Sequence, residues 1–208
     1  MRSARSVLIW AVLAAAIGVP IVFAMASEQL AWRGPVYIVA GFAGIIALGL
    51  VLVQPVLIAG YLPGLQAYRG RRAHHWIGGA LVAMVLIHVG GLWITSPPDM
   101  IDALTFTSPT PFSPFGVIAM WAIFAVALLA LFRRRLGPRT WRVVHMLFAA
   151  IIVAGGVVHA MLVEGTMETV SKAALCALIL AATIKVMADL WLRQKKTRPV
   201  SSSSSGSF

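Results

Sequence analysis

The chain has 208 residues, of which 60% are hydrophobic and only 11% are charged, and its mean hydropathy is +0.91. A soluble domain carries about 25% charged residues, so the composition excludes an ordinary soluble enzyme and any large domain outside a membrane. The single cysteine excludes an intrachain disulfide, a CxxC pair and a cysteine-rich metal site.

Long apolar runs predict membrane-spanning helices of roughly 20 residues each, because a segment inside the bilayer must satisfy its own backbone hydrogen bonds. We expect six of them, at about 7–26, 35–61, 74–94, 115–132, 141–163 and 170–192. The sequence therefore predicts an all-α membrane protein, a six-helix bundle in three parts. These are an N-terminal helix with its outer loop (1–34), the main bundle (35–192) and a basic, serine-rich, disordered cytoplasmic tail (193–208).

The first predicted span has two interpretations. Arg2 and Arg5, the apolar run and the final Ala24-Met25-Ala26 resemble a secretory signal with a cleavage site. The run is longer than the usual apolar region of a signal, which favours a retained helix. Between the third and fourth spans, residues 95–114 contain five prolines, so we expect an irregular cap there rather than a helix.

The basic residues gather on one side of the predicted bundle and orient it. Fourteen of the seventeen lie on that side: Arg2, Arg5, Arg69, Arg71, Arg72, Arg133, Arg134, Arg135, Arg139, Arg142, Arg193, Lys195, Lys196 and Arg198. The opposite side holds Glu28, Asp99, Asp102, Glu164 and Glu168. Positive loops face the cytoplasm, so the net charge of +11 reports topology and not nucleic-acid binding. We expect a bacterial-type inner membrane protein with both termini in the cytoplasm.

Four of the five histidines form two pairs with the same spacing in the sequence. His74 and His88 are fourteen residues apart in the third predicted span, and His145 and His159 are fourteen apart in the fifth. Fourteen residues of α-helix turn through about 1400°, close to four full turns, and rise about 21 Å. Each pair therefore lies on one helix face. The alternative partner of His88 is His75, which a thirteen-residue step puts about 140° around the helix.

The third and fifth spans run in the same direction, so the histidines match in depth across the bundle. His74 and His145 lie near the inner side, and His88 and His159 near the outer side. Ionisable groups inside a membrane are rare and usually functional, and two facing histidines are the axial ligands of a six-coordinate heme. The sequence therefore predicts two bis-histidine sites for heme b, stacked across the bilayer. Neighbouring glycines at 78–79, 90–91 and 155–156 leave room for a macrocycle or for another helix.

Two short motifs surround these histidines. HHWIG at residues 74–78, followed by His88, is similar to an H-R-W-L-G pattern with a second histidine fourteen residues after the first. RRLG at 134–137 and WRVVH at 141–145, followed by His159, are similar to an R-R-x-L-G, W-R-x-L-H stretch. Over roughly residues 36–192 the chain thus resembles the ferric-reductase-like transmembrane family, which includes the membrane parts of ferric reductases and NADPH oxidases. The resemblance aligns His75 with an arginine and so favours His74 as ligand.

This resemblance implies a six-helix bundle with two b-type hemes that passes electrons across the membrane. Larger members of the family carry a cytoplasmic flavin and nicotinamide module, but no G-x-G-x-x-G motif occurs here. We therefore expect an oxidoreductase membrane component without catalytic residues of its own, fed by a separate flavin reductase, a flavin (FMN or FAD) or a quinol. The acceptor is expected outside, as a periplasmic protein or a ferric chelate. Arg142, three residues before His145, is the best candidate to pair with a heme propionate.

Two other functions stay open. The length and the six spans also suit the heme-binding membrane subunit of the periplasmic methionine sulfoxide reductase system. In that group the first ligand position is not generally histidine, so the complete four-histidine set favours the ferric-reductase-like protein. A small histidine-dependent transporter or proton channel is the alternative from another class, with Asp189 as the carboxylate inside a span.

Overall fold

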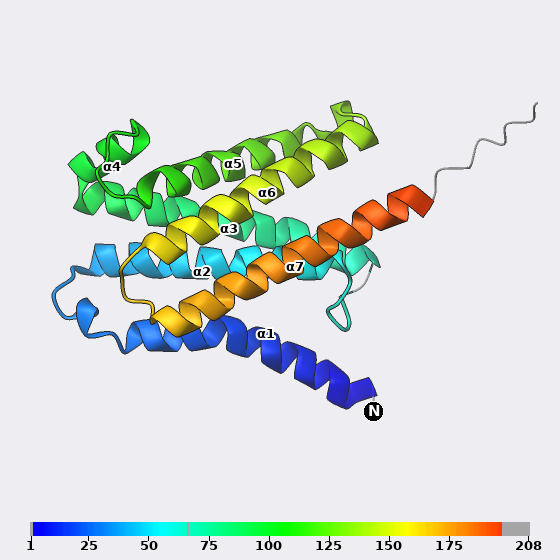
Figure 1. The fold of residues 1–208 in the computed structure, drawn as a ribbon, viewed down its shortest axis with the longest axis horizontal. Coiled ribbons are helices and arrows are strands. Elements are labelled where there is room, and N and C mark those ends of the chain that lie inside the picture. Colours follow the sequence, from blue (N-terminus) through cyan, green and yellow to red (C-terminus); the bar gives the residue numbers. More distant parts are fainter. Residues whose placement is uncertain (1, 66, 197–208) are drawn as a thin grey trace, which may run out of the picture.

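The computed structural model describes residues 2–65 and 67–196, and it is built of helices (Figure 1). Six helices in these ranges are long and apolar enough to cross a membrane, which confirms the predicted all-α, multi-pass architecture. They are α1 (Arg2–Met25), α2 (Pro35–Ile58), α3 (Ala67–Thr95), α5 (Ser113–Leu131), α6 (Pro138–Leu162) and α7 (Thr169–Lys196). The shorter elements are η1 (Glu28–Leu30), α4 (Pro97–Leu104) and η2 (Arg133–Arg135).

A Gly-Pro pair begins both α2 and α6. Gly34 and Gly137 have extended backbones at the N-cap positions, and Pro35 and Pro138 open the helices. Proline suits the first turn because the N–H that it lacks has no intrahelical acceptor there, and its φ is already helical. In the turn after α2, Gly60 adopts a positive φ of 72°, which a residue with a Cβ tolerates poorly.

Three spans extend four or more residues beyond a predicted end. α1 begins at Arg2, five residues before the expected start, α3 begins at Ala67, seven residues before it, and α7 continues four residues past Leu192 to Lys196. All three extensions contain arginine or lysine, and hydropathy alone assigns such residues to connections. A long basic side chain on a terminal turn can still reach water, so the helix does not have to end where the apolar run ends. Residues 193–196 belong to α7, and the rest of the predicted tail, 197–208, lies outside the described residues.

The prediction of an irregular segment between the third and fourth spans is wrong for its first part, because residues 97–104 form the helix α4. Pro97 and Pro98 occupy the first turn of α4, where a proline costs no hydrogen bond. The following stretch, 105–112, has no regular secondary structure, and Phe106 adopts a φ of 59° there. Prolines in this connection therefore begin helices as well as interrupt them.

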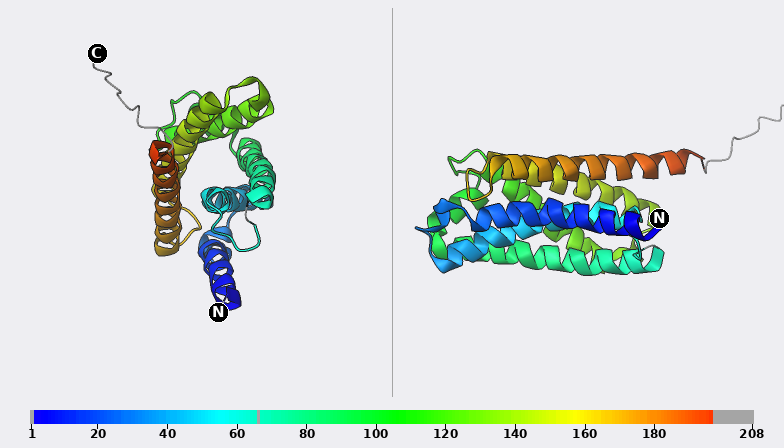
Figure 2. Two further views of the ribbon diagram at one scale, coloured as in Figure 1. Left: turned by 90° about the vertical axis from the view of Figure 1, so that its right-hand side faces the viewer. Right: turned by 90° about the horizontal axis from the view of Figure 1, so that it is seen from below.

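The long helices form two antiparallel pairs, α2 with α3 and α5 with α6. α7 packs against α2 and α6, and α1 packs against α7 and α2. Seen end-on in Figure 2, α2, α3, α5, α6 and α7 surround a common axis, and α1 lies outside them. Because α3 and α6 run in the same direction, residues at matching positions along them share a depth in the bundle.

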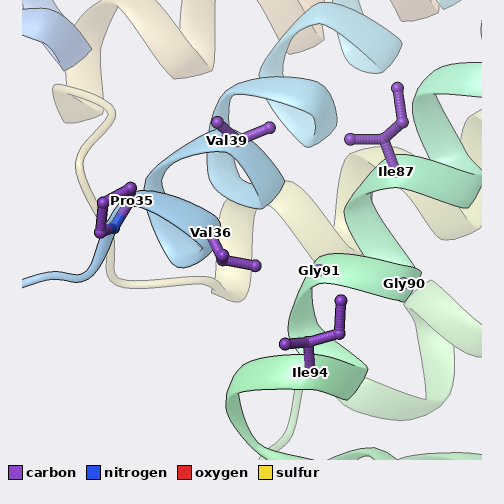
Figure 3. A pocket seen from close by; sticks show the side chains of 7 residues that line it. All are labelled: Pro35, Val36, Val39, Ile87, Gly90, Gly91 and Ile94. Carbon is purple, nitrogen blue, oxygen red and sulfur yellow. The ribbon is translucent and has the colours of Figure 1, made fainter.

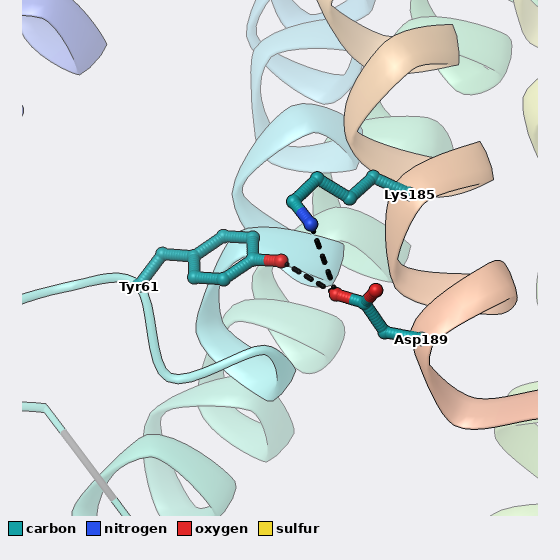
Figure 4. A network of polar contacts seen from close by, with 3 residues as sticks. All are labelled: Tyr61, Lys185 and Asp189. Atoms are coloured by element: carbon teal, nitrogen blue, oxygen red, sulfur yellow. Dashed lines mark hydrogen bonds and ion pairs between the residues drawn. The ribbon is translucent and has the colours of Figure 1, made fainter. Parts of the chain in front are cut away.

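One end of the bundle is basic. The exposed arginines at this end, on α3, η2 and α6, are Arg69, Arg71, Arg72, Arg133, Arg134, Arg135, Arg139 and Arg142. At the same end the Tyr61 hydroxyl donates a hydrogen bond to the Asp189 carboxylate at 3.0 Å, and the Lys185 ammonium lies 3.1 Å from the same oxygen (Figure 4). This polar contact ties the turn after α2 to α7.

The opposite end carries an apolar groove of about 400 Å³ between the start of α2 and the end of α3 (Figure 3). It is lined by Pro35, Val36, Val39, Ile87, Gly90, Gly91 and Ile94. A Cβ added at Gly90 would meet nothing within 4 Å, whereas one at Gly91 would lie 2.7 Å from the Ala40 Cβ. Gly91 therefore serves close packing of α3 against α2, and Gly90 leaves the groove open.

Candidate functional site

The structure brings the four histidines of the predicted sites together in two pairs. α3 carries His74 and His88, and α6 carries His145 and His159. The ring centroids of His74 and His145 are 6.0 Å apart, and those of His88 and His159 are 6.5 Å apart. The planes of the two rings meet at 72° in the first pair and 80° in the second. Each pair thus bridges α3 and α6 at one depth of the bundle.

This spacing suits a metal ion held between two imidazoles. Imidazole nitrogens bind transition metals at about 2 Å, so two rings on opposite sides of one metal have centroids roughly 6 Å apart. Steeply inclined planes are compatible with such a site, since each ring can rotate about its metal–nitrogen bond. Within the described ranges no group of three or more His, Cys, Asp or Glu side chains could hold a metal ion. A heme needs only two axial ligands from the protein, so the residues present fit a heme.

Both outer histidines donate a hydrogen bond from Nδ1 to a backbone carbonyl of another part of the bundle. His88 Nδ1 lies 2.8 Å from the Ala40 oxygen in α2, and His159 Nδ1 lies 2.9 Å from the Phe112 oxygen just before α5. The bond places the proton on Nδ1 and leaves the Nε2 lone pair for a metal. Such an acceptor also holds the ring in place and makes it a stronger ligand.

A glycine lies under each outer ring. A Cβ at Gly44 would be 2.9 Å from His88 Nδ1, and a Cβ at Gly116 would be 2.5 Å from His159 Nδ1. Each glycine stands four residues after the accepting carbonyl on the same stretch of chain, so the missing side chain lets the ring reach that carbonyl. Sequence reasoning missed both glycines, because they lie on helices without histidine. The sequence signal that could have found them is a small residue on the antiparallel neighbouring helix at the depth of a histidine.

The inner pair is held differently. Nδ1 of His74 and Nδ1 of His145 are both buried, and neither has a hydrogen-bond partner. The indole of Trp141 stacks on the His145 ring, with centroids 5.1 Å apart and planes 28° apart. Gln54 Nε2 donates a hydrogen bond of 3.5 Å to the backbone oxygen of His74. The inner rings are therefore positioned by packing, without the carbonyl acceptors of the outer pair.

Two further candidates from the sequence lie at the edge of the inner pair. His75 is exposed, and its Nε2 accepts a hydrogen bond of 2.9 Å from the Arg133 guanidinium. The ring nitrogen that would bind a metal is thus engaged in His75, whereas the His74 ring faces His145. Arg142 is exposed, and its Nε donates to the Pro138 oxygen of its own helix at 3.3 Å.

A family model for the "Ferric reductase like transmembrane component" matches residues 40–156, more than half of the chain. The chain belongs to this ferric-reductase-like family. No curated protein and no solved structure matches the chain. The matched range contains His74, His88 and His145, and His159 lies three residues beyond its end. The hydrogen bond to Phe112 and the glycine beneath the ring nevertheless give His159 the same surroundings as His88.

An aliphatic layer separates the two histidine pairs of this ferric-reductase-like bundle. Leu81 lies seven residues from both His74 and His88, and Ile152 lies seven from both His145 and His159, so both mark the middle level. The two belong to one buried cluster, whose other members are Ala47, Val85, Val117, Met120, Ala122 and Ile123. The cluster therefore places buried apolar side chains at the level between the two histidine pairs.

Of the glycines near the histidines in sequence, Gly155 packs tightly, as Gly91 does. A Cβ at Gly155 would lie 2.9 Å from the Phe115 oxygen, at the contact of α6 with α5. A Cβ at Gly79 or Gly156 would meet nothing within 4 Å. The tight glycines thus serve helix contacts, and within residues 2–65 and 67–196 the glycines whose Cβ would meet a histidine ring are Gly44 and Gly116.

Proposed function

We propose that the protein is the membrane component of an electron-transfer system and carries electrons across the bilayer by means of two b-type hemes. His74 and His145 would hold one heme at the inner level, and His88 and His159 the other at the outer level. The observation that carries the proposal is the presence of two facing imidazole pairs about four helical turns apart. Membership in the ferric-reductase-like family supports it.

A heme held by two histidines would supply a one-electron couple, and with both of these ligands in place it would offer no coordination position to a substrate. The residues of the chain would bind the two hemes, orient the histidine ligands and separate the two hemes by apolar side chains. The outer histidines keep Nδ1 protonated against their carbonyls and present Nε2. The buried aliphatic side chains around Leu81 and Ile152 would disfavour water and ions at the level between the two hemes. The chain therefore relays electrons, and reactions with substrates belong to its partners.

The donor and acceptor follow from the proposed orientation. The arginine-rich end of the bundle would face the cytoplasm of a bacterial-type cell, with both termini on that side of the inner membrane. Electrons would enter there from a separate flavin reductase, a flavin or a quinol, and leave at the outer end to a periplasmic protein or a ferric chelate. Arg142, on the first turns of α6, is our candidate to pair with a carboxylate of the inner heme.

The heme content of the purified chain tests this proposal. We expect a reduced b-type absorption spectrum with about two hemes per chain, and roughly half of that after replacement of both His88 and His159 by alanine. In sealed vesicles, an impermeant reductant outside is expected to reduce entrapped ferricyanide only when the wild-type chain is present. A chain that purifies without heme would contradict the proposal and leave the histidine-dependent transporter.

Cysteine labelling tests the orientation. Cys176 is 3% exposed, so Cys176→Ser gives an unreactive background in which single cysteines can be placed. We expect Glu28→Cys, on the turn after α1, to react with an impermeant maleimide in intact spheroplasts. Arg134→Cys, in η2, should react only after the membrane is permeabilised, because the positive end faces the cytoplasm. The reverse pattern would invert the proposed topology.

A further inference from the structure

The outer and inner histidines of α3 differ in their hydrogen bonds. His88 Nδ1 donates to the Ala40 carbonyl, whereas His74 Nδ1 is buried without a partner. A histidine that binds a metal through Nε2 needs an acceptor for Nδ1–H, because that bond sets the tautomer and the orientation of the ring. Inside a bilayer water does not readily supply the acceptor. The inner site therefore requires an acceptor from the protein.

The antiparallel register of α2 and α3 places Gln54 at that position. His74 precedes His88 by fourteen residues on α3, and Gln54 follows Ala40 by fourteen on α2. Because the helices run in opposite directions, Gln54 faces His74 as Ala40 faces His88. The hydrogen bond of 3.5 Å from Gln54 Nε2 to the His74 oxygen shows this proximity directly.

The residue at the position of Gly44 differs at the inner level. Gly44 stands four residues after Ala40, and a Cβ there would lie 2.9 Å from His88 Nδ1. The residue four positions after Gln54 is Ile58, so no glycine stands at the matching inner position. His74 Nδ1 makes no hydrogen bond, so it is free to donate to a side-chain acceptor from α2.

The Gln54 carboxamide has an unused acceptor. Its Oε1 is buried and has no hydrogen-bond partner, although its Nε2 is engaged. A buried carbonyl oxygen without a donor is unfavourable, and so is a buried N–H without an acceptor. The unpaired Gln54 oxygen and the unpaired His74 Nδ1–H are complementary groups on facing turns of α2 and α3.

We propose that Gln54 is a positioning residue for the inner heme, whose carboxamide oxygen accepts the Nδ1–H of His74. This inference rests on the proposed function, since it gives His74 the role of an axial ligand. The amide nitrogen stays on the His74 carbonyl, so one side chain holds both the backbone and the ring of the ligand. Gln54 thus does for the inner site what the Ala40 carbonyl and Gly44 together do for the outer site.

Redox titration of Gln54→Leu tests the proposal. Without the acceptor the His74 imidazole becomes a weaker donor to iron and stabilises the oxidised form less, so the midpoint potential of the inner heme rises. The outer heme, identified as the component lost in His88→Ala, keeps its potential. Gln54→Glu retains an acceptor oxygen, so its inner potential stays at or below the wild-type value. Gln29→Leu, outside the spans, is the matched control and shifts neither heme.

An unchanged inner potential in Gln54→Leu would overturn the proposal, and so would equal shifts of both hemes or loss of the inner heme in both Gln54 variants. Loss of the inner heme in Gln54→Leu alone, with Gln54→Glu retaining it, would support it. A wild-type chain without heme would refute the proposed function and this inference with it. Two hemes in the wild type with unmoved potentials in Gln54→Leu would refute only the role of Gln54.

Discussion

Replacing Gly116 with alanine is expected to remove the outer heme and leave the inner one. The new Cβ would lie 2.5 Å from Nδ1 and 2.8 Å from Cε1 of His159. The ring cannot stay in place, because the new Cβ would meet atoms of the rigid imidazole itself. One of these atoms is the Nδ1 that donates to the Phe112 carbonyl. Moving away breaks that bond and shifts Nε2 from the position opposite His88. Both changes remove the geometry that a shared metal needs.

The heme content of purified Gly116→Ala should fall by roughly half, since one of two bis-histidine sites is lost. Loss of helix stability does not explain such a result, because alanine is favoured over glycine within a helix by about 1 kcal/mol. Gly18→Ala is the matched control, since a Cβ there meets nothing within 4 Å and α1 lies outside the helices that surround the histidine pairs. Two retained hemes with wild-type potentials in Gly116→Ala would show that the ring does not need this contact.

The sequence predicts the features that follow from the pattern along a single helix. The apolar runs reveal the six spans, and the fourteen-residue spacing puts His74 with His88 and His145 with His159 on common faces of α3 and α6. Depth in the bundle follows from the alternating direction of the spans. The spacing along a helix and the direction of each span can both be read from the sequence without knowledge of how the helices pack.

The hydrogen-bond acceptors and the glycines next to the histidine rings depend on the axial register between neighbouring helices, which the sequence does not reveal. The carbonyls of Ala40 and Phe112 carry no side-chain signal, and any residue type supplies one. Gly44 and Gly116 resemble the other glycines of apolar helices until the neighbouring helix is positioned. The glycines closest to the histidines in sequence draw attention first, yet Gly91 packs against α2 and does not touch a histidine ring. The second layer of the site therefore appears only in the assembled bundle.

Helix ends show a second gap in sequence reasoning. Charged residues mark the end of an apolar run but not the end of a helix, so α3 starts seven residues earlier than predicted. A proline can likewise mark either the end of a helix or the first turn of a new one. At α4 only the structure shows that the prolines belong to a first turn. The earlier start places Arg69, Arg71 and Arg72 on the helix that carries His74, below the inner histidine pair.

Adjacent histidines provide the sharpest test of the inner site. We expect His74→Ala to lose the inner heme, which lowers the heme content by roughly half and abolishes electron transfer across sealed vesicles. His75→Ala should keep both hemes and most of that transfer. The physical reason is that the His74 ring lies 6.0 Å from the His145 ring, whereas His75 Nε2 is bound by the Arg133 guanidinium at the exposed edge.

Electron transfer is the stronger readout of this pair, because loss of the inner heme leaves the inner level about 21 Å from the outer one along the helix axis, the rise of fourteen residues. His75→Ala is the matched control, since it removes the same side chain one position away on the same turn. Arg133→Gln removes the partner of His75 and should also leave both hemes in place. Loss of the inner heme in His75→Ala, with His74→Ala unaffected, would assign the ligand to His75 and require α3 to rotate by about 100° at this turn.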